Sequence, residues 1–359
     1  MLIYVCISGH GFGHGSRVAS VLSALHQLQP SWRIVLSTPL PARFLNLAFE
    51  EIPFEHRPLR WDVGVIQADA LGADPDATLA ELEALDERLP QQIQQELAWL
   101  SEQAESVVVL ADVPPDAARL ARALAAPLIW MGNFGWDAIY RSMGGSFTAL
   151  AERALALYRQ GTALIRCPLA MEMDWGLPSH DVGLTAGRPR QDSAAVRDRL
   201  NLRAAPDRTV LMGFGGLGLQ LNPGLFARWP DHHFLVSDPG LHCAAKNVSV
   251  LPQDLRPLEV MPLCSRVITK PGYSTFCEAM ALGLGIHLVH REGFAEAQVL
   301  EDALQRHSPH RLLSRAQLEK GEWQLDQPLI PASGSGLPPD GADQAARILI
   351  ALASDLRCC

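Results

Sequence analysis

The chain has 359 residues, of which 48% are hydrophobic and 19% are charged, and its formal net charge is -9. This length exceeds one ordinary hydrophobic core and suits two α/β domains. The hydrophobic content excludes a disordered chain. The acidic balance argues against a dedicated nucleic-acid-binding protein, which would present a basic surface.

Targeting signals are missing from the sequence. No segment is apolar for long enough to cross a bilayer. Residues 1–8 read as a short buried strand rather than as a signal peptide. The seven cysteines include no CxxC pair. We therefore expect a cytoplasmic protein with reduced cysteines, and a peripheral contact with a membrane stays open.

Strand and helix patterns alternate along the first half of the chain. Short apolar runs separated by amphipathic segments predict a parallel sheet covered on both faces. The expected strands are Ile3–Ile7, Arg33–Ser37, Ser106–Ala111 and Pro127–Met131. The expected helices are Ser16–Gln27, 76–104 and Arg119–Ala125.

The same alternation restarts in the second half, after irregular segments at Arg166–Pro168 and Asp181–Arg190. A Pro/Gly/Ser stretch at Pro331–Asp340 reads as a linker. We expect an N-terminal domain over 1–185, a second domain over 186–340, and a final helix within 341–359 that packs back on the first domain. The expected strands of the second domain are Arg208–Phe214, His233–Ser237, Val248–Leu251, Arg266–Thr269 and Gly285–His290, and its expected helices are Asp192–Leu200, Cys277–Leu282 and Ala295–Gln305.

A glycine-histidine segment, SGHGFGHGSR at residues 8–17, follows the first strand and opens a helix. Its glycine spacing differs from GxGxxG, so a plain dinucleotide site is not expected. His14 can accept a proton from a hydroxyl near neutral pH, although it may instead be satisfied by the backbone. We predict that His14 is catalytic and that His10, Gly13 and Arg17 contact substrate. Arg17 has a second interpretation, as a solvated arginine on the first turn of the helix.

Two segments of the second domain suit a phosphorylated ligand. The first, LMGFGGLG at 211–218, contains Gly215 and Gly216, which can form an anion-binding turn. The second, TKPGYSTFCEA at 269–279, runs from a strand into a helix. Backbone amides at such a helix start receive phosphate groups. From this second segment we predict a nucleotide site that contains Lys270, Gly272, Ser274, Thr275 and Glu278.

Glu278 has two interpretations. Its carboxylate can hold ribose hydroxyls, or it can close a capping box with Thr275, since the two residues have the spacing of that motif. The segment GFAEAQ at 293–298 opens the next helix, and its Glu296 and Gln298 either read sugar hydroxyls or cap and solvate the helix.

A fourth segment, NFGWDAIY at 133–140, follows the strand Pro127–Met131. Loops at the carboxyl ends of parallel strands bind ligands in α/β proteins. We therefore expect Asn133 and Trp136 to bind the acceptor and Asp137 to be a second candidate base. Trp136 and Tyr140 may equally be core anchors. No Walker A loop, zinc pattern or GxSxG elbow occurs, so we predict no metal site.

These motifs together resemble known proteins. The loop with Gly13, His14 and Arg17, and the segment from Pro271 to Ala279, resemble the signatures of GT-B glycosyltransferases of the family 28 type, which include the lipid II-forming GlcNAc transferases. The chain is more closely similar to the glycosyltransferase-like N-terminal half of L-arabinokinases, in residues 9–14, 112–114, 133–140 and 270–279.

The resemblance implies two Rossmann-like parallel-sheet domains that face each other across a cleft, the GT-B fold. It also implies that the residue at Glu278 holds ribose and that Gly215 and Gly216 contact a diphosphate. It does not extend to arabinose kinase activity. The Glu296-Ala297-Gln298 string departs from the Gln or Asp-Gln pair that many such enzymes have, so the donor sugar stays open.

We expect a metal-independent glycosyltransferase that transfers a hexose or pentose from a nucleotide sugar, UDP-linked, to a hydroxyl of an unidentified small molecule or glycan. The nucleotide sugar is a substrate, and no separate cofactor is expected. Two alternatives keep the same fold. One is a nucleotide-sugar-binding module without catalysis, and the other is an enzyme of the UDP-sugar 2-epimerase type.

Overall fold

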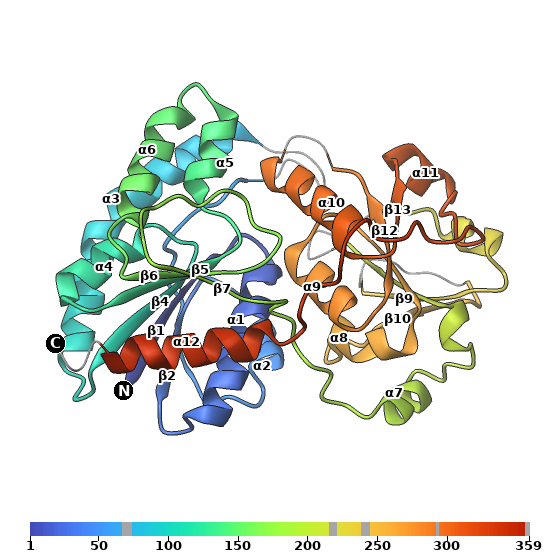
Figure 1. Ribbon diagram of the computed structural model, residues 1–359, viewed down its shortest axis with the longest axis horizontal. Helices are drawn as coiled ribbons and strands as arrows, with labels where there is room; N and C mark the ends of the chain where they lie inside the picture. Colours follow the sequence, from blue (N-terminus) through green and yellow to red (C-terminus); the bar gives the residue numbers. More distant parts are fainter. Residues whose placement is uncertain (67–73, 215–220, 238–244, 292–293, 356–359) are drawn as a thin grey trace. The chain divides into compact units, whose positions relative to one another are not determined.

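The computed structural model describes residues 1–66, 74–214, 221–237, 245–291 and 294–355 (Figure 1). Its chain divides into two compact units. Among the described residues, unit 1 consists of 1–66, 74–185 and 340–355, and unit 2 consists of 186–339. The helix at the end of the described chain therefore belongs with the N-terminal unit.

Unit 1 is built on a seven-stranded parallel sheet with the strand order β3-β2-β1-β4-β5-β6-β7. The order reverses between β1 and β4, and such a reversal is the position at which α/β proteins bind ligands. The strands are β1 Leu2–Ile7, β2 Arg33–Ser37, β3 Glu55–Arg57, β4 Val107–Asp112, β5 Leu128–Gly132, β6 Ala163–Arg166 and β7 Ser179–Asp181.

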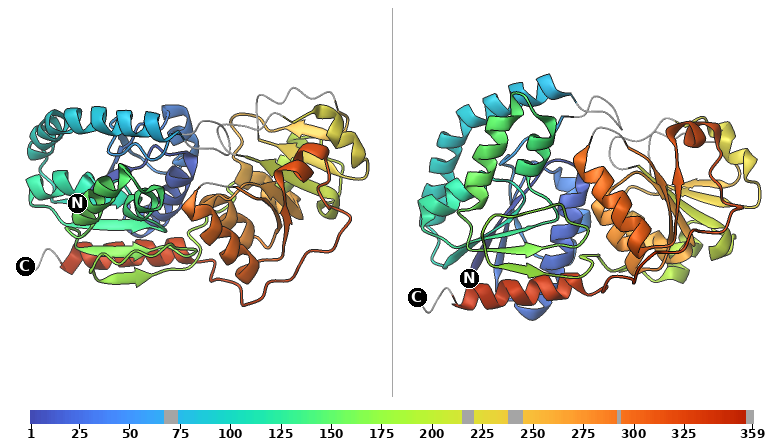
Figure 2. Two further views of the ribbon diagram at one scale, coloured as in Figure 1. Left: turned by 90° about the horizontal axis from the view of Figure 1, so that it is seen from above. Right: turned by 45° about the horizontal axis from the view of Figure 1, so that its top comes forward.

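Helices cover the two faces of this sheet. Figure 2 shows α3 and α12 on opposite sides of the strands, and α12 packs along α1. Alternate residues of β1, including Leu2 and Tyr4, pack under α3 and α4 in one core cluster. The helices are α1 Phe12–Leu28, α2 Ala42–Ala48, α3 Pro75–Ser101, α4 Ala117–Leu124, α5 Trp136–Met143, α6 Phe147–Tyr158 and α12 Gly341–Asp355.

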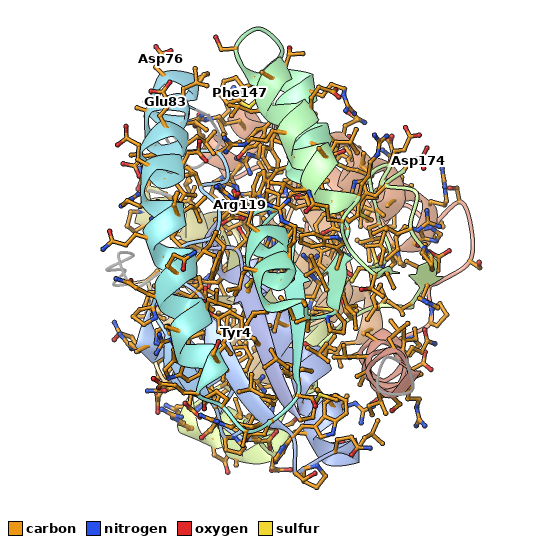
Figure 3. The ribbon with its side chains drawn as sticks, turned by 90° about the vertical axis from the view of Figure 1, so that its left-hand side faces the viewer. Tyr4, Asp76, Glu83, Arg119, Phe147 and Asp174 are labelled. Atoms are coloured by element: carbon orange, nitrogen blue, oxygen red, sulfur yellow. The ribbon has the colours of Figure 1, made fainter. Side chains whose placement is uncertain are left out.

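The helices α3, α4 and α6 lie side by side on one face (Figure 3). Asp86 of α3 accepts contacts from Arg119 of α4 at 3.2 Å and from Arg153 of α6 at 3.1 Å. These side chains are partly exposed, so the ion pairs add little to stability.

Unit 2 has a six-stranded parallel sheet with the order β10-β9-β8-β11-β12-β13. Its strand order reverses between β8 and β11. The strands are β8 Thr209–Gly213, β9 His233–Val236, β10 Val248–Val250, β11 Arg266–Thr269, β12 Gly285–Val289 and β13 His310–Leu313. The helices are α7 Ser193–Arg199, α8 Pro257–Val260, α9 Tyr273–Ala281, α10 Ala295–His307 and α11 Arg315–Lys320.

An aromatic cluster anchors the core of unit 2. The rings of Phe226, Phe234 and Trp323 meet edge to face with centroids 5.0 to 5.2 Å apart. Each is fully buried. Such pairs add a favourable term to the burial of their large apolar surfaces.

The predicted alternation of strands and helices is confirmed, and Arg33–Ser37 and Arg266–Thr269 are strands with the expected bounds. The structure adds β3, β6, β7 and β13, which have three or four residues each. Such strands are too short to show a period, and two of them, with the sequences EHR and SHD, lack an apolar run. The expectation of a loop at 133–140 is wrong beyond Gly135, because Trp136, Ile139 and Tyr140 have helical spacing and form the buried face of α5.

Of the helices that the structure describes, none is both long and apolar enough to cross a membrane.

The start of α12 supplies a test of this arrangement. A Cβ atom at Gly341 would overlap the backbone carbonyl group of Gly183. The Gly341 amide also donates a 3.1 Å hydrogen bond to the carbonyl of Leu184. Since the backbone would have to shift, we expect Gly341→Ala to reduce the free energy of unfolding by about 1–3 kcal/mol, measured by calorimetry. Gly336→Ala is the control, because its Cβ would meet no atom within 4 Å. Equal melting temperatures for the two variants would contradict the close packing of Gly341 against the backbone of Gly183.

Candidate functional site

The loop after β1 lies at the reversal of strand order in unit 1. Gly11 is the N-cap of α1 and has a φ of 93°, a left-handed conformation that favours glycine. Phe12 is 40% exposed, and Gly9, Gly11 and Gly13 are also exposed. The loop therefore presents backbone to solvent directly above the first turn of α1.

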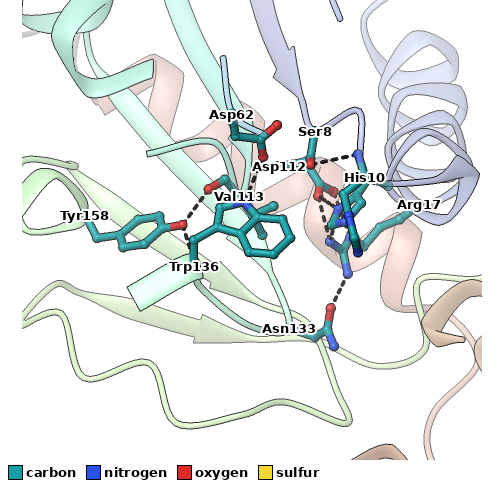
Figure 4. A network of polar contacts seen from close by, with 10 residues as sticks. Ser8, His10, Arg17, Asp62, Asp112, Val113, Asn133, Trp136 and Tyr158 are labelled. Carbon is teal, nitrogen blue, oxygen red and sulfur yellow. Dashed lines mark hydrogen bonds and ion pairs between the residues drawn. The ribbon is translucent and has the colours of Figure 1, made fainter. Parts of the chain in front are cut away.

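Beneath the loop, four polar side chains form one buried cluster (Figure 4). The Nδ1 atom of His14 lies 2.7 Å from Oδ1 of Asp112. Arg17 donates to both carboxylate oxygens of Asp112, from Nε at 2.7 Å and from Nη2 at 2.6 Å. Its Nη1 donates to Oδ1 of Asn133 at 2.6 Å. Each side chain is less than 10% exposed. The cluster thus ties α1 to the ends of β4 and β5.

Charge holds Asp112 in its ionised form. Burial alone would raise the pKa of this carboxyl group, but the charge of Arg17 and the hydrogen bonds from Arg17 and His14 outweigh burial. The net pKa of Asp112 lies below its usual value. An ionised carboxylate only accepts hydrogen bonds. The hydrogen between Asp112 and His14 therefore belongs to Nδ1 of the imidazole, and Nε2 is the nitrogen that can take up a proton.

Val113, which follows Asp112, has a strained backbone. Its φ of 67° is unusual for a β-branched residue and costs on the order of 1–3 kcal/mol. The Val113 carbonyl accepts a 2.6 Å hydrogen bond from the hydroxyl of Tyr158. The same hydroxyl accepts a 3.0 Å bond from the backbone amide of Trp136. Tyr158 thus fixes the chain where it leaves β4 and where α5 begins.

A second buried carboxylate supports the glycine-histidine loop. Asp62 accepts a 2.7 Å hydrogen bond from Nε1 of Trp136 and further bonds from the Ser8 side chain and the Gly9 backbone. Burial nevertheless raises its pKa above the usual value. The ring of His10 meets that of Trp136 edge to face, with centroids 5.2 Å apart. Trp136 is fully buried, so it is a core residue against which the glycine-histidine loop packs.

Asp137 lies in the first turn of α5 and is 4% exposed. Burial raises the pKa of its carboxyl group. A Cβ atom at the preceding Gly135 would overlap both Asp137 and Trp175, so glycine is needed there for close packing. The two candidate bases come from different elements: His14 lies in α1, which follows β1, and Asp137 lies in α5, which follows β5.

In unit 2, helix α9 begins within the segment 269–279, and it begins before Thr275, the residue that a capping box with Glu278 would need as the N-cap. The N-cap is Gly272, which makes Thr275 the third helical residue, and no side chain of the described residues caps the helix. The capping-box interpretation of Thr275 and Glu278 is therefore wrong. The first turn of α9, including Ser274, presents its backbone amides beside the reversal of strand order between β8 and β11.

Lys270 directly follows β11 and is half-buried. Burial and, to a smaller extent, the positive charge of Arg291 lower the pKa of its ammonium group to about 8. Gly215 and Gly216, which were expected to contact a diphosphate, lie outside the described residues.

The three remaining candidates of unit 2 differ in their surroundings. Burial raises the pKa of Glu278 to about 7, while Arg256 lowers it and Glu259 raises it. Glu296 is half-buried in the first turn of α10. Gln298 is exposed and donates a 2.9 Å hydrogen bond to Asp302, one turn further along the helix.

Sequence reasoning did not select Asp112 as a site residue, although the structure places it at the centre of the polar cluster. The available signal was its position as the last residue of a buried strand. Recognising its role required the pairing of β4 with β1, in which Ile7 lies opposite Asp112. No three acidic, histidine or cysteine side chains of the described residues are placed to hold a metal ion.

Comparison with known proteins places this geometry in context. No protein-family model matches the chain. The chain is 25% identical to L-arabinokinase of Arabidopsis thaliana over 362 aligned residues, which cover 96% of this chain and 33% of the relative. The chain therefore spans about a third of the length of the curated relative that it matches, and the two are distant homologues over nearly the whole chain.

Solved structures share the fold. Phytolacca americana UGT2, complexed with UDP-2fluoro-glucose and pterostilbene, is 13% identical with a TM-score of 0.62, over 97% of this chain and 89% of that one. Medicago truncatula UGT71G1, complexed with UDP-glucose, is 13% identical with a TM-score of 0.59, over 97% and 93%. At this identity the likeness establishes the fold alone. The two parallel α/β sheets form the GT-B glycosyltransferase fold.

Replacement by asparagine of two buried aspartates of unit 1, Asp112 and Asp116, should have different effects on stability at pH 8. Asp112→Asn leaves the charge of Arg17 buried without its counter-ion and should cost about 3–5 kcal/mol. The low pKa of Asp112 means that its stabilisation is present above pH 4 and is lost as the pH falls through the folded-state pKa.

Asp116, at the start of α4, is the matched comparison. Burial raises its pKa to about 6, although Arg153 and Arg119 lower it and Asp86 raises it less. The raised pKa of Asp116 should cost the wild type about 2 kcal/mol of stability between pH 4.5 and pH 8, since the unfolded chain releases this proton more readily. Asp116→Asn should remove that loss and be at least as stable as wild type at pH 8. The free energy of unfolding of both variants is measured by calorimetry at pH 4.5 and 8. Equal destabilisation by the two substitutions at pH 8 would contradict the assigned difference between a paired Asp112 and an Asp116 of raised pKa.

Proposed function

We propose that this protein is a glycosyltransferase that moves a sugar from a nucleoside-diphosphate sugar, UDP-linked, to a hydroxyl group. The observation that carries the proposal is the 2.7 Å contact between His14 and Asp112 at the carboxyl ends of β1 and β4. A histidine oriented by an ionised carboxylate is suited to remove a proton from a hydroxyl.

On the acceptor side, His14 is the general base. Its Nε2 accepts the hydroxyl proton while the acceptor oxygen forms a bond to the anomeric carbon. The bond from that carbon to the diphosphate oxygen breaks, and the nucleoside diphosphate leaves with the electron pair. Asp112 stabilises the imidazolium that forms, and Arg17 with Asn133 holds Asp112 in place.

On the donor side, unit 2 binds the nucleotide sugar. The backbone amides at the start of α9 and the Lys270 side chain stabilise the charge that grows on the diphosphate. We assign Gly272, Ser274 and Thr275 to the same group of contacts, and Glu278 to the ribose. Gly215 and Gly216 are assigned to the diphosphate, and Glu296 and Gln298 to the donor sugar.

The structural relatives support a nucleotide sugar as the class of ligand. The structural relatives were solved with UDP-glucose or with a fluorinated UDP-sugar, and one of them also with the aromatic acceptor pterostilbene. The curated relative is named L-arabinokinase, and its match to this chain supports the shared fold and not the choice between a hexose and a pentose donor. The acceptor of the present protein stays a matter for screening.

The remaining candidates of unit 1 fit supporting roles. His10 and Gly13 lie on the glycine-histidine loop, where we assign them to the acceptor. Trp136 positions that loop through Asp62. Asp137 is the second candidate base, and its burial in α5 favours His14 over it.

One observation favours a second candidate function, a nucleotide-sugar-binding module without transfer. Arg17 occupies both oxygens of Asp112, and its Nη2 lies 3.2 Å from Nδ1 of His14. A guanidinium so close weakens the stabilisation that Asp112 gives to an imidazolium. Binding without turnover on a broad acceptor panel would support this alternative.

Enzyme assays on a histidine pair separate these functions. Purified protein is incubated with UDP- and GDP-sugars and a panel of hydroxylated acceptors, and release of the nucleoside diphosphate is measured. His14→Gln should lower kcat by about 10²–10⁴-fold, because it removes the base. Binding of the nucleotide sugar should be unchanged, since unit 2 supplies that site.

His26→Gln is the matched control, because His26 lies in the last turn of the same helix and should leave kcat unchanged. Equal activity of His14→Gln and His26→Gln would refute the role of His14. Failure of both UDP and GDP to bind the wild type would refute the donor-site assignment. Formation of a free sugar or a 2-epimer without an acceptor would indicate the epimerase alternative instead.

A further inference from the structure

A second buried carboxylate, besides Asp112, acts on His14. Asp62 lies in the segment between β3 and α3. Burial raises the pKa of Asp62, and hydrogen bonds from Ser8 and Trp136, the charge of a protonated His14 and a hydrogen bond from the Gly9 backbone lower it. Since the attraction between two charges is mutual, an ionised Asp62 stabilises the imidazolium of His14 by the same amount.

The hydrogen-bonding partners of Asp62 match its ionised form (Figure 4). Nε1 of Trp136 donates to it at 2.7 Å, and an indole nitrogen is only a donor. The backbone amide of Gly9 is a donor as well. The Ser8 hydroxyl oxygen accepts a 3.2 Å hydrogen bond from the backbone amide of His10, so its own hydrogen can be donated to Asp62. Three donors around one carboxyl group favour the carboxylate.

The charge balance of the polar cluster explains why a second carboxylate matters. Arg17 donates to both oxygens of Asp112, and its Nη2 lies 3.2 Å from Nδ1 of His14. Asp112 faces one cation before His14 takes up a proton and two cations afterwards. Two cations beside one carboxylate repel each other, which weakens the base. With Asp62 included, two positive charges meet two negative charges after the proton is taken up.

Several other ionisable side chains near Asp62 add little net charge. Asp116 and Arg153 line the same small cavity as Asp62, and their charges have opposite signs. His10 accepts a 3.4 Å hydrogen bond at Nδ1 from the backbone amide of Val65, which matches a neutral ring. Burial raises the pKa of three further groups well above their usual values, so they stay uncharged near neutral pH: Cys6, Tyr140 and Tyr158.

We propose that Asp62 is a positioning residue of the transfer reaction, which holds the glycine-histidine loop through Ser8 and Gly9 and supplies the negative charge that stabilises the imidazolium of His14. The inference rests on the role of His14 as the base in the proposed function. It adds a residue that lies outside the four segments singled out in the sequence. It also offsets the proximity of Arg17 to His14, which favours binding without transfer.

NMR titration of the His14 ring tests the charge of Asp62 without any substrate. The ring Cε1–H signals of labelled histidines are followed against pH on the full chain, and the signal lost in His14→Gln is that of His14. Asp62→Asn removes the charge and keeps the shape, so the midpoint of the His14 titration should move down by about one pH unit. Asp62→Glu keeps the charge and should retain most of the wild-type midpoint.

Two control variants separate the charge of Asp62 from its hold on the loop. Ser8→Ala removes a hydrogen bond to Asp62 and leaves the charge in place, so the His14 midpoint should stay near that of the wild type. Asp116→Asn removes a buried carboxylate whose charge Arg153 and Arg119 already offset, and it should also leave the midpoint in place.

Folding and kinetics complete the experiment. Melting temperatures show whether unit 1 stays folded. If Asp62→Asn unfolds, Asp62→Glu and Asp62→Gln give the same comparison, because their side chains have equal length and differ in charge. Where the wild type transfers sugar from a UDP-sugar, Asp62→Asn should lower kcat about tenfold and shift the acidic limb of the kcat/KM profile to lower pH, since the base is weaker. Binding of UDP should be unchanged.

The outcomes distinguish this inference from the proposed function. If Asp62→Asn and the wild type titrate with the same His14 midpoint, the inference is refuted, whether or not transfer is observed. If Ser8→Ala lowers the midpoint as much as Asp62→Asn does, loop geometry rather than charge controls His14, and the inference is refuted as well. If the midpoint falls in Asp62→Asn alone but the wild type transfers no sugar, the charge effect of Asp62 stands and the proposed function fails.

Discussion

A buried ion pair between Arg17 and Asp112 joins the first turns of α1 to the end of β4, at the point where the strand order of unit 1 reverses. Burying two charges is costly, and the cost is offset only when every hydrogen-bonding group finds a partner. Here His14 and Asn133 complete the shell of this pair. The ion pair therefore fixes the start of α1 and the ends of β4 and β5 relative to one another, and it sets which nitrogen of His14 carries a proton.

A second layer keeps this cluster rigid. The strained backbone at Val113 persists because the surrounding contacts determine its conformation, above all the hydroxyl of Tyr158. Trp136 connects that region to Asp62, which in turn holds the backbone of the glycine-histidine loop. A histidine that must meet a hydroxyl at hydrogen-bonding distance benefits from such support, since small displacements reduce proton transfer steeply.

Unit 2 follows a different electrostatic strategy. Unit 1 buries a carboxylate and an arginine as a complete pair, whereas unit 2 gathers basic groups at the ends of β11 and β12 and leaves the start of α9 without a side-chain cap among the described residues. A complete pair is suited to orient a catalytic group. Backbone amides at the start of a helix are suited to receive an anion, and this contrast is the physical basis for assigning acceptor chemistry to unit 1 and diphosphate binding to unit 2.

The sequence by itself determined the class of fold and indicated the segments in which we predict the sites. Apolar runs alternating with amphipathic segments predict two parallel sheets, because the period of a strand and that of a helix are local properties. Glycine, histidine and small hydroxyl residues that directly follow a strand are also local features, and they indicated candidate sites at 8–17 and 269–279. Only the tertiary structure decided which side chains contact one another. It brought Asp112 to His14 across 98 positions of sequence. It placed the start of α9 at Tyr273 with Gly272 as the N-cap, which excluded a capping box, and it placed Trp136 in the core. These outcomes depend on strand order, on helix bounds and on burial, which arise from contacts between distant segments and leave no periodic pattern in the chain.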